Sequence, residues 1–131
     1  MMDGQVHHIP SRRLRQLERL FADMRHTHTL DDVLHLIDTG LMQSFAVNES
    51  WAVTSITVFP RKSVLEVFMV VGDDADMPEL EDKVQEFARS LGVTLIRAYG
   101  REGWARRAEA RGWKVGPRIY VKELSDGRWQ G

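Results

Sequence analysis

The 131-residue sequence contains no cysteine, almost no net charge and no long apolar run. The absence of cysteine excludes a disulfide framework, a thiolate metal site and a cysteine nucleophile. A membrane-spanning helix needs about 20 consecutive apolar residues, and no stretch reaches that length. Because the formal net charge is only −1, overall charge gives no argument for a nucleic-acid or membrane partner. These absences favour a cytoplasmic protein without a membrane partner.

What is present is the composition of an ordinary globular protein, with 43% apolar and 28% charged residues. A chain of this length has room for one domain and buries enough surface to fold without a metal or a disulfide. We therefore expect a single domain over residues 1–124, followed by a loose polar tail over residues 125–131.

Apolar residues at helical spacing predict four helices. The first spans 11–25, and the second begins after the N-cap residue Thr29. The third helix, Glu79–Leu91, follows Asp76, which we expect to cap it, and a short fourth helix spans Glu102–Arg111. Ten residues of these helices and of the strands are predicted to form the core: Leu17, Phe21, Val33, Ile37, Val67, Met69, Val84, Phe87, Leu91 and Ile96.

Runs of β-branched and aromatic residues predict the strands. Trp51–Phe59 and Val64–Val71 are joined by a turn and form a predicted hairpin, and further strands are expected over Gln5–Ile9, Thr94–Tyr99 and Arg118–Leu124. The element order is then β-α-α-β-β-α-β-α-β. This order predicts an α/β (α+β) domain with a mixed, mostly antiparallel sheet and helices on both faces.

This element order, together with the late segment Trp104–Trp113, resembles the GCN5-related N-acetyltransferase (GNAT) family, including its small bacteriophage-encoded members. The resemblance covers most of the chain as an order of elements. It implies that the central strand Val64–Val71 leads into a loop that binds the phosphates of acetyl-coenzyme A. It also implies a glutamate as general base and a tyrosine as general acid, for which Glu66, Tyr99 and Tyr120 are the candidates.

The loop after the central strand departs from the family pattern Arg/Gln-x-x-Gly-x-Gly/Ala. Glycines in that pattern let backbone N–H groups approach a pyrophosphate. Here the loop contains Gly72 as its one glycine, together with Asp73, Asp74 and Asp76. These carboxylates repel an anion within a Debye length of about 8 Å, so we expect no acetyl-coenzyme A and no other cofactor. A solvated helix start, a divalent-cation site and an acidic partner-binding patch are alternative interpretations of the same loop.

Basic residues gather late in the sequence with tryptophans among them. The predicted basic face consists of Arg101, Arg106, Arg107, Arg111 and Lys114. Such a face binds nucleic acid, other phosphates or an acidic protein, or is simply solvated. His26 and His28 also lie close together, but their spacing is typical of a polar loop, so we predict no metal site.

Three functional hypotheses follow from these patterns. The first is a GNAT-like domain without catalysis that binds a protein partner, as a bacteriophage accessory or virion-associated protein in the host cytoplasm or virion. The second is an active acyl-coenzyme A-dependent N-acetyltransferase with an atypical cofactor loop. The third is a small nucleic-acid-binding module that uses the basic face.

Overall fold

The computed structural model describes residues 11–100 and 104–124. The predicted strand Gln5–Ile9, the basic residue Arg101 and the predicted tail 125–131 lie outside the described residues. The chain divides into two compact units, Met1–Tyr99 and Gly100–Gly131. The predicted single domain over residues 1–124 extends across both units and stays a prediction.

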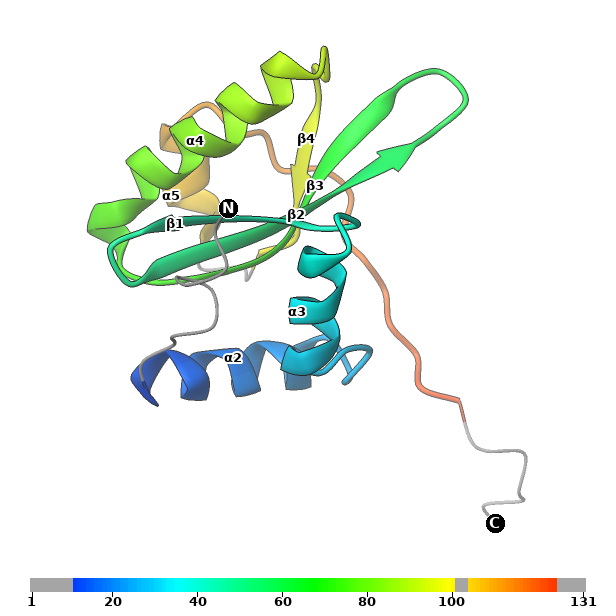
Figure 1. The fold of residues 1–131 in the computed structure, drawn as a ribbon. Coiled ribbons are helices and arrows are strands. Elements are labelled where there is room, and N and C mark those ends of the chain that lie inside the picture. Colours follow the sequence, from blue (N-terminus) through cyan, green and yellow to red (C-terminus); the bar gives the residue numbers. More distant parts are fainter. Residues whose placement is uncertain (1–10, 101–103, 125–131) are drawn as a thin grey trace. The chain divides into compact units, whose positions relative to one another are not determined.

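A four-stranded sheet forms the centre of the first unit, in the order β1-β2-β3-β4. Its strands are β1 (Gln43–Val47), β2 (Ser50–Val58), β3 (Ser63–Val71) and β4 (Ile96–Ala98). The first three strands pair antiparallel, and β4 pairs with β3 in parallel (Figure 1). This mixed, mostly antiparallel sheet confirms the predicted fold class, a GNAT-like α+β fold.

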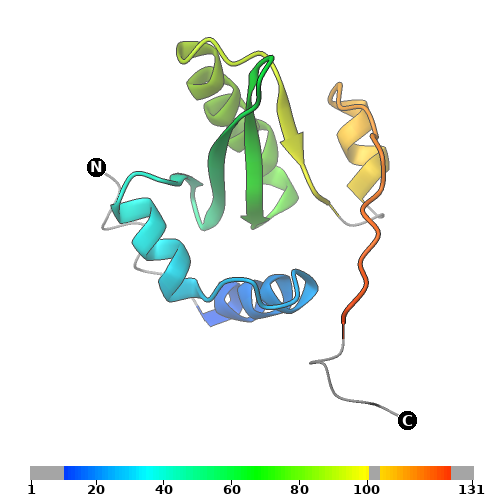
Figure 2. The same cartoon turned by 90° about the vertical axis from the view of Figure 1, so that its right-hand side faces the viewer.

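Helices cover both faces of this sheet, as predicted (Figures 1 and 2). Helices α2 (Ser11–Asp23) and α3 (Leu30–Asp38) lie on one face, and α4 (Met77–Ser90) lies on the other. Thr29 caps α3 as expected, because its Oγ1 accepts from the backbone N–H of Asp32 at 3.1 Å. The Asp32 carboxylate accepts in return from the Thr29 N–H at 2.9 Å, which completes a capping box.

An apolar cluster lies between the sheet and the α2–α3 layer. Its buried members are Leu17, Phe21, Val33, Trp51, Val53, Met69 and Val71. Of the other predicted core residues, Val67 and Val84 are buried, whereas Ile37, Phe87 and Ile96 are only half-buried. The prediction for Leu91 is wrong: this residue is 53% exposed, because it follows the last helical residue of α4.

Two strand predictions need correction. Strand β1 was not expected, because Gln-Ser-Phe-Ala-Val has little β-branched character; a two-residue turn with Asn48 at φ 53° pairs it with β2. The prediction of a strand over Arg118–Leu124 is wrong, because these residues have no strand structure. The short helix of the second unit, α5, spans Ala105–Ala110.

Strands β3 and β4 share only three residue pairs, from Leu65↔Ile96 to Val67↔Ala98. Directly after them the register of β3 against β2 shifts, and Phe68 has no residue opposite it. Such a bulge bends the strand that carries it. Among the described residues, no strand is paired with β3 on its β4 side from Phe68 onward, where β3 runs towards the loop that precedes α4.

Candidate functional site

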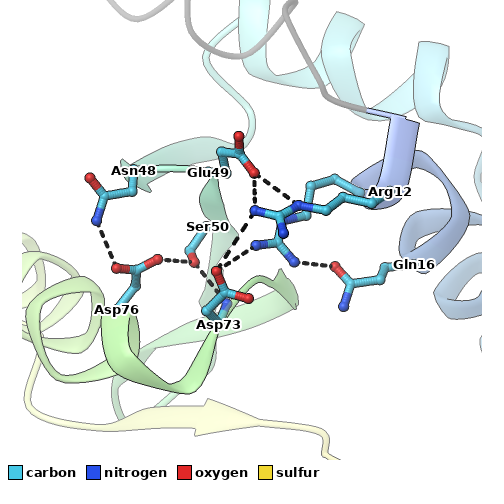
Figure 3. Close-up of polar contacts among 8 residues, drawn as sticks. Arg12, Gln16, Asn48, Glu49, Ser50, Asp73 and Asp76 are labelled. Carbon is cyan, nitrogen blue, oxygen red and sulfur yellow. Dashed lines mark hydrogen bonds and ion pairs between the residues drawn. The ribbon is translucent and has the colours of Figure 1, made fainter.

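The loop between β3 and α4 meets the turn between β1 and β2 (Figure 3). The pairing of Trp51 with Val71 brings Ser50 next to Gly72. Gly72 has φ 145°, and a Cβ atom added to it would lie 2.0 Å from Ser50 Oγ. The one glycine of this loop is therefore required by an internal contact with the turn.

Ser50 is the centre of a hydrogen-bond network that closes the loop. Its side chain is buried, and Oγ donates to Asp76 Oδ2 at 2.6 Å and accepts from the Asp73 N–H at 3.0 Å. Asn48 Nδ2 donates to Asp76 Oδ1 at 2.8 Å, and the Asp76 N–H donates to the Asp73 carbonyl at 3.0 Å. The hydrogen bond from Ser50 first, and that from Asn48 second, hold the pKa of Asp76 below its usual value.

The predicted helix cap at Asp76 is wrong. Asp76 is the residue before α4, but its side chain makes no capping hydrogen bond to the helix. Both of its carboxylate oxygens accept hydrogen bonds from Ser50 and Asn48, which lie 26 and 28 residues earlier in the chain. The carboxylate therefore ties two loops together instead of capping a helix.

Two arginines of α2 reach the same loop, and one of them, Arg12, is labelled in Figure 3. Arg13 is only 3% exposed, and its Nη2 lies 2.9 Å from Asp73 Oδ2. Its Nη1 donates to Gln16 Oε1 at 2.9 Å. Arg12 Nε donates to Glu49 Oε1 at 3.0 Å, and Arg12 Nη2 lies 4.0 Å from the Asp73 carboxylate. These ion pairs were not predicted from the sequence, although Arg13 stands four residues before buried Leu17 on one helix face.

Glu66 and Tyr99, two of the catalytic candidates, lie in one polar cluster of the first unit. Glu66 accepts from Thr57 Oγ1 at 2.5 Å and from Arg97 Nη2 at 2.9 Å, and Tyr99 also hydrogen-bonds to it. The Thr57 hydrogen bond, followed by the bond and charge of Arg97, lowers the pKa of Glu66 from its usual value. The Arg97 guanidinium also lies 5.1 Å from the centre of the Phe59 ring.

Tyr120 and the described members of the basic face belong to the second unit. Tyr120 is 93% exposed. Of the basic residues, Arg106, Arg107 and Lys114 are exposed and Arg111 is half-buried. Arg107 lies 5.7 Å from the centre of the half-buried Trp104 ring, so part of this face packs against an aromatic side chain.

The aspartates of the loop do not converge on a common point. Asp73 faces Arg13, Asp76 faces Ser50 and Asn48, and Asp74 is exposed in the short 3₁₀ turn Asp74–Asp76. Within residues 11–100 and 104–124, no group of three His, Cys, Asp or Glu side chains could hold a metal ion. No helix in those residues is long and apolar enough to cross a membrane.

Solved structures show what this fold is similar to. An acetyltransferase from Trypanosoma brucei matches 72% of this chain and 78% of its own, with a TM-score of 0.58 and 18% identity. A point mutant of a Thermus thermophilus protein matches 77% of this chain and 83% of its own, with a TM-score of 0.57 and 16% identity. A tetramutant of a Bacillus halodurans protein covers 94% of both chains, with a TM-score of 0.65 and 9% identity.

These similarities establish the fold alone, because sequence identities this low carry no information about activity. No known protein family matches the sequence, and no curated protein is significantly similar to it. None of the structural neighbours supports a bacteriophage origin, which stays a prediction.

Proposed function

We propose that this chain is a GNAT-like domain that binds a protein partner and does not use acetyl-coenzyme A. The observation that carries the proposal is the closed network around Ser50. A phosphate-binding loop needs backbone N–H groups that are free to meet the ligand. In this loop the Asp73 N–H is bonded to Ser50 and the Asp76 N–H to the Asp73 carbonyl.

The charges of the loop also oppose the binding of acetyl-coenzyme A. Asp76 keeps its negative charge, because the two hydrogen bonds to its carboxylate favour the ionised form. Asp73 is partly neutralised by Arg13, but Asp74 and Asp76 stand directly before α4, where the cofactor phosphates would lie in a GNAT enzyme. Acetyl-coenzyme A does not fit this set of residues.

The polar cluster around Glu66 also lacks the features of a catalytic base. A base for an amine acts best with a pKa near the working pH, whereas the pKa of Glu66 is lowered. Arg97 pairs with Glu66 and lies over Phe59. Its guanidinium therefore occupies the position in which the amine of a substrate would meet Glu66.

A protein partner is favoured because large apolar side chains are exposed at one side of the first unit. They are Val58 at the end of β2, Phe59 in the turn after it, and Leu95 and Tyr99 directly before and after β4. Apolar groups that gather on a surface mark sites of protein association.

A thermal-shift titration with acetyl-coenzyme A tests the absence of cofactor binding, with an active acetyltransferase as the positive control. A ligand at about 100 times its Kd stabilises a protein by about 2.7 kcal/mol, which raises the Tm of a domain of this size by roughly 10 °C. We expect no change in Tm for this chain. A clear, saturable rise would refute the proposal.

An active N-acetyltransferase is the second candidate, and one observation favours it. The pairing of β3 with β4 ends at Val67 and Ala98, so no described strand is paired with the rest of β3 on that side. Release of free thiol from acetyl-coenzyme A in the presence of amine-bearing peptides distinguishes the candidates, since only the enzyme produces it.

A further inference from the structure

Helix α2 presents a row of exposed arginines, which we call the α2 stripe: Arg12, Arg15 and Arg19. Their spacing of three and four residues places them on one side of the helix. In the part of the chain that the structure describes, Arg15 and Arg19 have no ion-pair partner, and Glu18 beside them pairs with neither. Arg12 pairs with Glu49, yet its side chain is still 58% exposed.

The α2 stripe does not stabilise the helix that carries it. Arg15 and Arg19 are like charges one helical turn apart, and such pairs repel each other. Packing does not need them either, because the opposite side of α2 supplies Leu17 and Phe21 to the core. An anion bound between the guanidinium groups would remove the repulsion, so the stripe fits a ligand that brings negative charge.

The rest of this chain does not supply that charge. Residues 1–10 contain one acid, Asp3, and residues 100–131 contain eight Lys and Arg against four Asp and Glu, a net charge of +4. Residues 73–90 contain seven Asp and Glu against two Lys and Arg, a net charge of −5, but α4 lies on the opposite face of the sheet from α2 (Figure 1). The first unit therefore presents only one positive side to an anionic molecule.

The chemistry of the α2 stripe favours the phosphates of a nucleic acid. Helix α2 contains four arginines and no lysine, and the planar guanidinium group binds phosphate through two parallel hydrogen bonds. A protein interface has an apolar core, and a helix on a membrane surface exposes an apolar face. Leu14, at 38%, is the one exposed large apolar side chain of α2, which is too little for either partner.

The stripe also favours a duplex over a single strand. Proteins bind single strands largely by stacking the bases on aromatic side chains, and Phe21, the one aromatic residue of α2, is buried. A duplex instead offers rows of phosphates. Arg12 and Arg19 lie about 10 Å apart along the helix axis, which corresponds to about three phosphates of one strand at about 3.4 Å each.

From these observations we propose that the α2 stripe binds the phosphate backbone of double-stranded DNA. Phosphate contacts position a protein on a duplex but carry no sequence information, so this binding is independent of sequence. The inference goes beyond the proposed function, because it adds a nucleic-acid ligand to the protein partner.

Fluorescence anisotropy of a short labelled DNA duplex, titrated with the full chain at several salt concentrations, tests the proposal. Each phosphate contact contributes about −0.9 to the slope of log K against log salt concentration. Arg15→Gln/Arg19→Gln should make this slope shallower by about 1.8 and weaken binding at about 50 mM salt by roughly tenfold or more. Glutamine and arginine have similar helix propensities, so we expect the Tm of this variant not to fall.

Arg61→Gln/Lys62→Gln is the matched control, because it removes the same two charges from the exposed turn between β2 and β3. We expect it to leave the salt dependence nearly unchanged. Single-stranded DNA, an RNA duplex, and vesicles of phosphatidylserine and phosphatidylcholine are the further arms of the test. Each of them should bind the wild-type chain more weakly than the DNA duplex does.

A wild-type chain that does not bind the duplex at low salt would overturn the inference. So would an unchanged slope in Arg15→Gln/Arg19→Gln, an equal change in the control variant, or tighter binding of the RNA duplex or of the vesicles. These failures leave the proposed function standing, because that proposal fails only if acetyl-coenzyme A binds.

Discussion

Replacing Ser50 by alanine should open the loop that precedes α4. The Ser50 side chain is buried and makes two hydrogen bonds, one to the Asp76 carboxylate and one from the Asp73 N–H. Alanine keeps the backbone and most of the volume but removes both bonds. Loss of a buried hydroxyl that bonds a charged group costs about 1–3 kcal/mol, and we expect a destabilisation in that range.

Urea unfolding monitored by tryptophan fluorescence measures this loss of unfolding free energy, because Trp51 adjoins Ser50 in β2. Asn48→Gly is the control: Asn48 donates to the same carboxylate but is exposed, and glycine adopts its φ of 53° without strain, so this change should cost less. In the double variant Ser50→Ala/Asp76→Ala the losses should be less than additive, since both changes remove one shared contact. A loss below about 0.5 kcal/mol for Ser50→Ala would refute the role given to this network.

Three further predictions concern other parts of the chain. Leu17→Ala should cost about 2–5 kcal/mol in urea unfolding because Leu17 is 1% exposed, whereas Leu91→Ala, at an exposed position, should cost far less. The pKa of Asp76 is lowered by folding, so its contribution to stability is present above the unfolded pKa of about 3.9 and is lost as the pH falls through the lower folded value. Asp76→Asn should therefore weaken the pH dependence of the urea midpoint over this acidic range. If the basic face binds a polyanion, the affinity for heparin should fall steeply with salt concentration, and the double variant Arg106→Gln/Arg107→Gln should show a weaker dependence on salt. Undetectable or salt-independent binding would rule out the nucleic-acid hypothesis.

Local sequence patterns predicted much of the fold because they act over a few residues. Thr29 and Asp32 are three residues apart, so the capping box of α3 is encoded within one helical turn. The β-branched residues of β2 and β3 likewise predicted the central hairpin. Strand β1 escaped prediction because its own residues have weak strand preference, and its pairing with β2 is what makes it a strand.

The candidate site could be predicted only in part, since its contacts join distant segments. Asp73 and Asp76 were identified in the loop, but a sequence pattern cannot tell that Ser50 competes with the helix for the Asp76 carboxylate. The burial of Arg13 has the same origin. Arg13 is buried whereas the neighbouring Leu14 is exposed, because Asp73 lies where the helix passes the end of the sheet.

Isothermal titration calorimetry of the wild-type chain with acetyl-coenzyme A is the most direct test of the claim that the loop is closed to the cofactor. Low ionic strength makes the test strict, because it gives any attraction or repulsion of charge its full effect. Runs with and without Mg²⁺ show whether a cation can bridge the aspartates and the phosphates. The closed Ser50 network predicts no saturable heat, and so a Kd weaker than about 1 mM in both runs. A Kd in the micromolar range would contradict it and make the N-acetyltransferase the better account of this protein.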